Sequence, residues 1–476
     1  MKIKMSHIRL TMRILGMVLL YITLFNNKFL PVMFLVGIGV VETLLLVLVW
    51  KRKILQIFVV IVMLLTSFGL LYTEDIVARL VTYNPYTINT VSFFVLKDSS
   101  IININRAIDK RIASSSVVEP SMNTLIQTKL TELGYTQTLI TFEGIQDGVD
   151  KLFNDEIDVI VLEEAYLDAI LELDPEFLLK TKVIYTLQNK IVKEPMPSGV
   201  DVTKEAFTVY ISGIDQPGEI SVESRSDVNI VMTVNPITHS IQMVSVPRDS
   251  HVLIEKPGCY RYTGYKDKLT NLGWQGFPCM IQTLDSLMSV KINFYLKVNF
   301  SSLYRIIKVL GPIEVYNEFE FRYHDELNTV DITYPQGNIT LSGMDAVYYS
   351  RARKSVGGLG GDIQRGKNQL EVIKGVVRKL ISLSTLTKTE SILKAVSGSI
   401  DTNMTSSEIF ALVRTQIQDL QPWTMNANAL SGSGALVTTT PYGGSKWVYN
   451  LNEDSIAAVS KILTDNLIIP VEENAQ

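Results

Sequence analysis

Ser245–Ser250 is the stretch best suited to chemistry, because an apolar run ends there at a proline and leads directly into Arg248 and Asp249. The run Ser240–Val246 is typical of a buried strand, and open α/β sheets bind ligands where their strands end. An arginine can hold two phosphate oxygens at once, and an aspartate is a hard oxygen ligand for Mg²⁺. The stretch therefore indicates a phosphate–metal site, whereas the dipeptide alone would more often be a surface ion pair.

A second pair of opposite charges precedes another predicted strand. Arg225 and Asp227 are two residues apart, just before the apolar run Val228–Val234. Strand ends of one sheet gather at its edges, so these side chains are candidates for the same site. Arg225 is a candidate phosphate contact and Asp227 a candidate metal ligand.

Two further arginines, Arg351 and Arg353, lie in the apolar and aromatic run Ala346–Arg353. The composition of this run predicts a strand. The two-residue period of a strand would place both arginines on one face, with Tyr349 beside them.

A glycine-rich stretch, Gly357–Gly361, precedes Asp362 and a run with helical periodicity that extends to about Ser382. Asp362 is a plausible N-cap, and Arg365 and Gln369 are four apart, so they share one helix face. A helix N-terminus behind a glycine-rich loop is a ready anion site. Together, the clustered arginines and aspartates indicate a polyphosphate ligand.

In order along the chain, RSD before a strand, SVPRDS after one, GMDAVYYSRAR and GD-x-x-R-x-x-x-Q resemble the motifs of the LytR–CpsA–Psr family. The likeness is strongest to capsule-biosynthesis members, which carry a multi-span N-terminus. It implies a cell-envelope phosphotransferase that uses Mg²⁺ and moves a glycopolymer from a polyprenyl-pyrophosphate carrier to a peptidoglycan sugar. The chain departs from the family at Lys367 and Asn368, where many members have further arginines, so a role for Lys367 is in doubt.

The resemblance implies a role for each candidate residue. Asp227 and Asp249 are assigned to Mg²⁺, or Mn²⁺, and either Asp249 or Asp362 accepts the proton of the attacking hydroxyl. The catalytic set is Arg248, Asp249, Arg351, Arg353, Asp362 and Arg365, and the substrate-binding set is Arg225, Tyr349 and Gln369. The alternative function is a non-catalytic regulator or scaffold of capsule synthesis that binds polyprenyl phosphate, although such a binder has little use for paired aspartates.

Composition limits the partners and the location. The net charge of −4 over 476 residues gives no indication of nucleic-acid binding. Apolar segments at about 8–25, 29–50 and 54–72 predict three membrane helices. Basic residues gather before the first segment and at Lys51–Lys53, which places the N-terminus in the cytoplasm and the chain after about residue 73 outside. Glu42 lies inside the second segment, either as a neutral acid near the interface or as a partner for another helix.

The expected organisation is a set of transmembrane helices at 1–73, a connector with a small α/β accessory domain at 74–197, and a phosphotransferase domain at 198–476. Alternating strands and helices predict a parallel sheet in the accessory domain. They predict a three-layer α/β/α large domain with a mixed central sheet. Expected partners are the carrier-linked glycan, peptidoglycan, the membrane and other capsule-assembly proteins.

Two further features of the large domain concern its interior. Cys259 and Cys279 lie in the exported part, where an oxidising compartment permits a disulfide, and two buried free thiols are the alternative. Apolar and aromatic residues are frequent at 292–310 and 370–385. They form either an ordinary core or, as the resemblance favours, a cavity for a polyprenyl chain that shares residues with the core.

Overall fold

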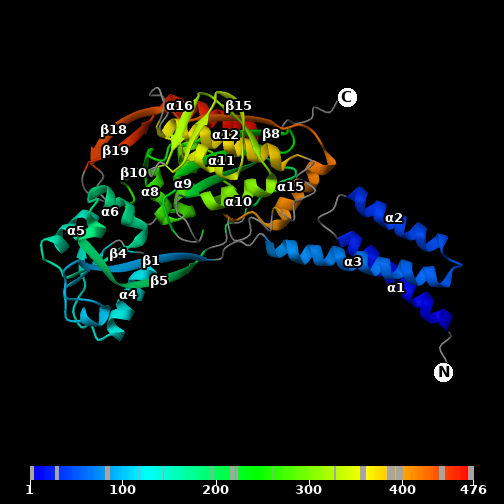
Figure 1. The fold of residues 1–476 in the computed structure, drawn as a ribbon, viewed down its shortest axis with the longest axis horizontal. Coiled ribbons are helices and arrows are strands. Elements are labelled where there is room, and N and C mark those ends of the chain that lie inside the picture. Colours follow the sequence, from blue (N-terminus) through cyan, green and yellow to red (C-terminus); the bar gives the residue numbers. More distant parts are fainter. Residues whose placement is uncertain are drawn as a thin grey trace.

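The computed structural model describes residues 5–26, 32–80, 86–116, 118, 120–142, 144–193, 196, 198–214, 220, 223–259, 261–325, 329–353, 361–382, 392, 400–438 and 445–469. Figure 1 shows a helical bundle at the N-terminal end, followed by a small α/β domain and a larger α/β domain. The larger domain holds the motifs that carry the candidate chemistry.

The N-terminal bundle consists of α1 (Met5–Asn26), α2 (Val32–Leu48) and α3 (Lys53–Leu80). Among the described residues, Lys53–Leu71 is long and apolar enough to cross a membrane, judged by length and composition. The apolar parts of α1 and α2, Leu10–Asn26 and Phe34–Leu48, are shorter. Each predicted apolar segment is therefore helical, whereas the number of membrane crossings stays a prediction.

Glu42 lies inside this bundle. Its side chain is buried against the neighbouring helices, and the hydroxyl of Thr66 donates a 2.7 Å hydrogen bond to its Oε1. The bond joins α2 to α3, so the structure agrees with the prediction of a carboxyl group that partners another helix.

The accessory domain has a five-stranded sheet in the order β3-β2-β4-β1-β5. Its strands are β1 (Tyr86–Leu96), β2 (Ile112–Ser115), β3 (Ile140–Phe142), β4 (Val159–Glu163) and β5 (Thr181–Val192). The predicted parallel pairing is correct for β2 with β3 and with β4. It is wrong for β1, which pairs antiparallel with β4 and β5. The long β1–β5 ladder decides this direction, because it satisfies the backbone groups of two extended strands along their whole length.

The helices of the accessory domain pack around this sheet. They are η1 (Ile104–Arg106), α4 (Pro120–Glu132), α5 (Ile145–Phe153), η2 (Glu164–Tyr166), α6 (Leu167–Leu173) and α7 (Phe177–Lys180). The sequence predicts one continuous helix over Ala165–Leu179, and that prediction is wrong. The helix ends at Leu173 because Pro175 disfavours the helical conformation for the residue before it, and Asp174 is extended.

The large domain is built on a six-stranded sheet in the order β16-β11-β6-β7-β8-β17. The strands are β6 (Phe207–Ile214), β7 (Val228–Asn235), β8 (Ser240–Ser245), β11 (Phe294–Asn299), β16 (Ile400–Thr402) and β17 (Thr424–Ala429). β11 is parallel to β6 and β17 to β8, whereas β6–β7, β7–β8 and β11–β16 are antiparallel. The prediction of a mixed sheet is confirmed.

Helices cover both faces of this sheet. α9 (Phe277–Met288) and α16 (Glu453–Leu467) pack on one face, around a core that includes Tyr210 of β6. α12 (Asp362–Leu380) and α15 (Ser406–Gln418) cover the other face, which receives Ile211 of the same strand. α10 (Phe300–Leu310) and α11 (Gly343–Arg351) extend the second layer beside α12 (Figure 1). This is the predicted three-layer α/β/α arrangement.

Shorter elements complete the large domain and border the site. They are β9 (His251–Leu253), β10 (Lys266–Lys268), α8 (Leu269–Leu272), η3 (Gly273–Gln275), β12 (Ile313–Asn317), β13 (Phe321–His324), β14 (Asp331–Tyr334), β15 (Gly337–Leu341), β18 (Gly432–Thr438) and β19 (Ser445–Leu451). The glycines within Leu430–Tyr449 predict a hairpin, and the antiparallel pair β18–β19 confirms it.

The strand predicted over Ala346–Arg353 is wrong, because these residues belong mostly to helix α11. Ser342 and Asp345 form a capping box at its N-terminus, and such a box satisfies backbone donors that a helix start leaves unpaired. The apolar and aromatic residues that suggested a strand instead form the buried face of this helix. Arg351 therefore ends the helix, and Arg353 lies just past it.

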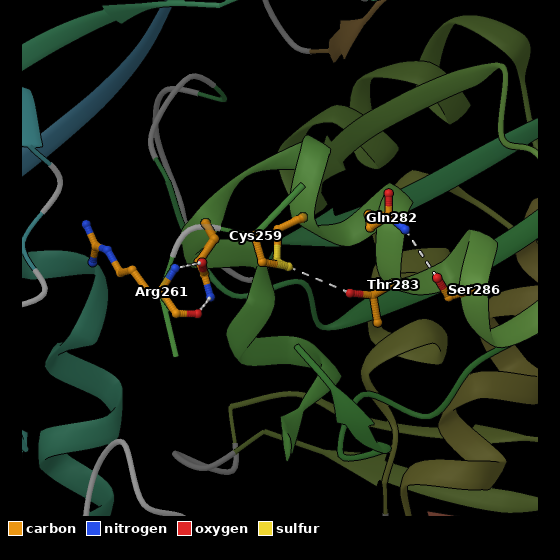
Figure 2. Close-up of a disulfide and its surroundings, with 7 residues drawn as sticks. Cys259, Arg261, Gln282, Thr283 and Ser286 are labelled. Carbon is orange, nitrogen blue, oxygen red and sulfur yellow. Dashed lines mark hydrogen bonds between the residues drawn. A yellow bond between two sulfur atoms is a disulfide. The ribbon is translucent and has the colours of Figure 1, made fainter. Parts of the chain in front are cut away.

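Cys259 and Cys279 form a disulfide, with their Cα atoms 4.3 Å apart, so that prediction is confirmed. Cys279 lies in the first turn of α9, and the bond ties the loop after β9 to this helix (Figure 2). Figure 2 also shows Arg261, two residues beyond Cys259, pointing away from the disulfide towards the accessory domain.

Arg261 joins the accessory domain to the large domain. Its Nη1 and Nη2 lie 2.7 and 2.8 Å from the two carboxylate oxygens of Glu163 in β4. Both side chains are almost fully buried, at 2% and 3% exposure. Tyr166 accepts a further 2.6 Å bond from Arg261, and its ring lies 4.4 Å from that of Trp274 in η3. Removing one partner of a buried pair strands the other charge, at a cost of about 3–5 kcal/mol, so this contact fixes how the domains dock.

We expect replacement of both cysteines by serine to lower the free energy of unfolding by about 3 kcal/mol. The bond closes a loop whose ends are 20 residues apart, and such a closure restricts the unfolded chain by about that amount. Chemical denaturation of the purified full-length protein in detergent, with and without reductant, measures the difference. Equal stability of the variant and the parent under oxidising conditions would contradict the assignment.

Candidate functional site

Arg248 is the centre of the candidate site. Its Nη1 donates a 2.6 Å hydrogen bond to Oδ1 of Asp227, and its Nε lies 3.7 Å from Asp249 and 3.8 Å from Asp362. Burial on its own would lower the pKa of Arg248, but these three carboxylates and that of Glu172 together outweigh burial and raise it. One arginine thus connects the start of β7, the loop after β8 and the first turn of α12.

Asp227 and Asp249 each have a further polar neighbour. The hydroxyl of Thr270 in α8 donates to Asp227 over 3.2 Å, and Lys268 Nζ lies 3.1 Å from Asp249 Oδ1. No local sequence pattern pointed to Lys268 or Thr270. Their positions follow from the turn between β10 and α8, whose backbone amides bond to the carbonyls of residues 248 and 250.

The N-terminus of α12 contributes the next part of the site. Arg365 Nη2 lies 2.8 Å from Asp362 Oδ1, and Arg353 Nε lies 3.9 Å from the same oxygen. Burial lowers the pKa of Arg365, and the neighbouring arginines act in the same direction. A Cβ on Gly366 would lie 2.8 Å from the hydroxyl of Ser245, so this glycine lets α12 approach the end of β8. Of the predicted glycine-rich loop 357–361, residues 357–360 lie outside the described residues. The prediction of Asp362 as N-cap is wrong, because Gly361 takes that position and Asp362 is the first residue of the helix.

A cavity of about 820 Å³ opens beside this cluster. Its apolar lining comes from both the sheet and the helices, and includes Ile211, Val298, Leu303, Val372 and Ile373. Its charged lining includes Asp227, Arg351, Arg353 and Arg365. The predicted cavity shared with core packing is therefore present, and its lining combines apolar side chains with charged ones that are mostly arginines.

The structure brings most predicted site residues together. Arg351, Arg353, Arg365 and Gln369 line the cavity, and Arg248 and Asp362 border a recess that adjoins it. The guanidinium of Arg351 also lies 4.9 Å from the ring centre of Phe300. Arg351 at the end of α11 and Arg353 just past it thus reach the cavity even though their segment is not a strand.

Tyr349 and Arg225 do not line the cavity. Tyr349 is buried in the core around Phe321 and Tyr334, and its hydroxyl donates to Asn317. Burial raises its pKa. Its predicted place beside the arginines on one strand face is wrong, because in a helix it projects towards the core. Arg225 turns to the accessory domain instead, where its Nη1 lies 2.6 Å from Glu172.

The carboxylates allow a test of the predicted metal site. Within the described residues, no group of three or more histidine, cysteine, aspartate or glutamate side chains could hold a metal ion. Asp227 and Asp249 both lie against Arg248. Mg²⁺ is usually held by one or two carboxylates together with substrate phosphates and water. The pair therefore fits an ion that arrives with a phosphate ligand, and not a cage made by the protein alone.

The fold and the site together define a three-layer α/β/α protein with an arginine–carboxylate cluster beside a partly apolar cavity. The chain belongs to the LytR_cpsA_psr family, whose model matches residues 180–465, more than half of the chain. The resemblance inferred from the motifs is thereby confirmed.

Relatives of this chain are named as transferases. A relative from Bacillus subtilis (strain 168), 28% identical over 56% of this chain and 79% of its own, is named polyisoprenyl-teichoic acid–peptidoglycan teichoic acid transferase TagU. One of the same name from Enterococcus faecalis (strain ATCC 700802 / V583) is 34% identical over 43% of this chain and 64% of its own. The crystal structure of B. subtilis TagV matches 56% of this chain and 99% of that chain, with 23% identity and a TM-score of 0.46.

Proposed function

We propose that this protein attaches capsular polysaccharide or a related glycopolymer to peptidoglycan, taking it from a polyprenyl-pyrophosphate carrier. The observation that carries the proposal is the 820 Å³ cavity, which combines an apolar wall with Arg351, Arg353 and Arg365. A lipid-linked pyrophosphate has the same two parts, an apolar chain and a concentrated negative charge. The names of the relatives support the same class of reaction.

In this proposal the polyprenyl chain lies along Leu303, Val372 and Ile373, and the pyrophosphate meets the arginines. The sugar hydroxyl of peptidoglycan attacks the phosphorus next to the glycan. A new P–O bond forms, the pyrophosphate bridge breaks, and polyprenyl phosphate leaves. Phosphoryl transfer depends mainly on positioning and on stabilisation of charge, which a cluster of arginines provides.

The proton of the attacking hydroxyl needs an acceptor. Asp362 has 22% of its side chain exposed and Asp249 only 12%. We propose Asp362, because a hydroxyl that enters from solvent meets the more exposed carboxylate first. We further propose that Asp227 and Asp249 hold Mg²⁺, or Mn²⁺, which would neutralise charge on the phosphate oxygens.

The direct test of this function uses purified full-length protein, a synthetic polyprenyl-pyrophosphate glycan, peptidoglycan oligomers and Mg²⁺. Mass spectrometry should detect the glycan joined to peptidoglycan through a phosphodiester, together with released polyprenyl phosphate. Tight binding of the donor without any joined product would instead favour the non-catalytic binder.

Replacing Arg353 with alanine should reduce transfer by roughly 10- to 150-fold or more, because a charge-assisted contact to phosphate is worth about 1.5–3 kcal/mol. Arg351→Ala should behave in the same way. The matched control is Arg378→Ala, on α12 away from the cavity, where the arginine bonds to the carbonyl of Glu314. Initial rates with equal amounts of folded protein decide, and parental rates in both cavity variants would remove these arginines from the site.

Activity should require a divalent ion, and Asp227→Asn or Asp249→Asn should raise the Mg²⁺ concentration needed for half-maximal transfer. An amide oxygen lacks the charge that makes a carboxylate a strong ligand for Mg²⁺. Metal titrations after treatment with chelator measure the requirement. Full activity in excess chelator would rule out the proposed use of the ion.

We also propose that the N-terminal helices α1–α3 anchor the enzyme with everything after about residue 73 outside the cytoplasmic membrane. The site then shares a compartment with the cell wall. Protease added to cells stripped of their wall should digest the large domain and spare Lys51–Lys53. A large domain that stays intact until the membrane is opened would exclude this topology, and with it the peptidoglycan acceptor.

A further inference from the structure

The seam between the accessory domain and the large domain contains a second group of basic side chains. Glu172 on α6 lies at its centre, with Oε1 2.6 Å from Arg225 Nη1 and Oε2 3.5 Å from Lys446 Nζ on β19. Burial alone would raise the pKa of Glu172, but Arg225, Lys446 and the nearby Lys268 outweigh burial and lower it. Glu172 therefore contacts two cations and lies near a third, Lys268, which itself pairs with Asp249.

Arg225 is not satisfied by this arrangement. Its side chain is only 9% exposed, and its Nε and Nη2 are buried without a hydrogen-bond partner among the described residues. A buried charged donor without an acceptor is costly, and most such groups in folded proteins have a partner. The unused donors of Arg225 would be satisfied by an additional acceptor, such as the oxygens of an anion.

Glu172 is not needed to hold the domains together. The nearly fully buried pair between Arg261 and Glu163 already fixes the docking, and Trp274 of the large domain packs into the accessory core. The side chain of Glu172, in contrast, is 35% exposed. Water can therefore solvate this carboxylate when it turns away, whereas Arg225 and Lys446 are buried, at 9% and 5% exposure, and need another anion in its place.

We propose that Arg225, Lys446 and Lys268 form a second anion subsite for a phosphate group within the glycopolymer donor, and that Glu172 occupies this subsite when the donor is absent. The proposal rests on the function proposed above. Lys268 also contacts Asp249, so the subsite lies directly beside the reaction centre. A phosphodiester near the carrier end of an anionic glycan could then bind there while the pyrophosphate occupies the cavity.

The test compares two synthetic donors on the same carrier, one with phosphodiester-linked units and one with a neutral glycan of equal length. The variants Glu172→Gln and Lys446→Met are made in the full-length protein, which is studied in detergent. The control is Lys461→Met, at an exposed lysine of α16. We expect Glu172→Gln to lower the KM for the phosphodiester donor several-fold, and Lys446→Met to raise it about as much. For the neutral donor, the KM of both variants should stay close to that of the parent. Thermal unfolding confirms that each variant is folded.

Changes that are equal for both donors, or absent in both variants, would contradict the subsite and leave Glu172 with a docking role only. Inorganic phosphate should compete more strongly with the phosphodiester donor than with the neutral one. Equal competition would place the anion at the pyrophosphate site, against the proposal.

A parent protein that transfers neither donor contradicts the proposed function alone. Equilibrium dialysis with a radiolabelled glycerophosphodiester then tests the subsite directly. Retention should be stronger for Glu172→Gln than for the parent, and weaker for Lys446→Met. Equal retention by all three proteins would refute the subsite.

Discussion

The site depends on one buried arginine held among three carboxylates. Arg248 contacts Asp227, Asp249 and Asp362, which come from three separate elements of the large domain. Without this guanidinium, three negative side chains would face one another in a poorly solvated place, where like charges repel strongly. With it, β7, the loop after β8 and α12 are held at one edge of the sheet. The same arginine thus supports the local fold and supplies charge to the site.

The cavity adds a second requirement, that apolar and charged side chains line the same space. α12 serves both needs, because Val372 and Ile373 face the apolar part and Arg365 and Gln369 line the same cavity one or two turns earlier. The close contact of Gly366 with Ser245 brings this helix against the sheet. A protein that handles a molecule with a lipid end and a phosphate end benefits from one helix that presents both surfaces.

Much of this arrangement follows from local sequence, and the failures have a common cause. The apolar run before Pro247, the charges around it and the helix after Asp362 were all predictable, because strand ends and helix starts leave local signals. Residues in α11 were misassigned since aromatic side chains at a buried helix face resemble those of a strand. The partner of Arg225 was not predictable, because Glu172 lies in another domain and no local pattern records that contact.

The disulfide has a consequence for where the molecule acquires its final shape. It ties the segment that carries Arg261 to α9. Arg261 in turn forms the buried ion pair with Glu163 of the accessory domain. The two cysteines pair stably only in an oxidising compartment. A chain still in the reducing cytoplasm would therefore lack the disulfide that stabilises the segment carrying Arg261. Under the topology proposed above, export and assembly would be coupled in this way, and a chain kept in the cytoplasm would present a looser surface to quality-control proteases.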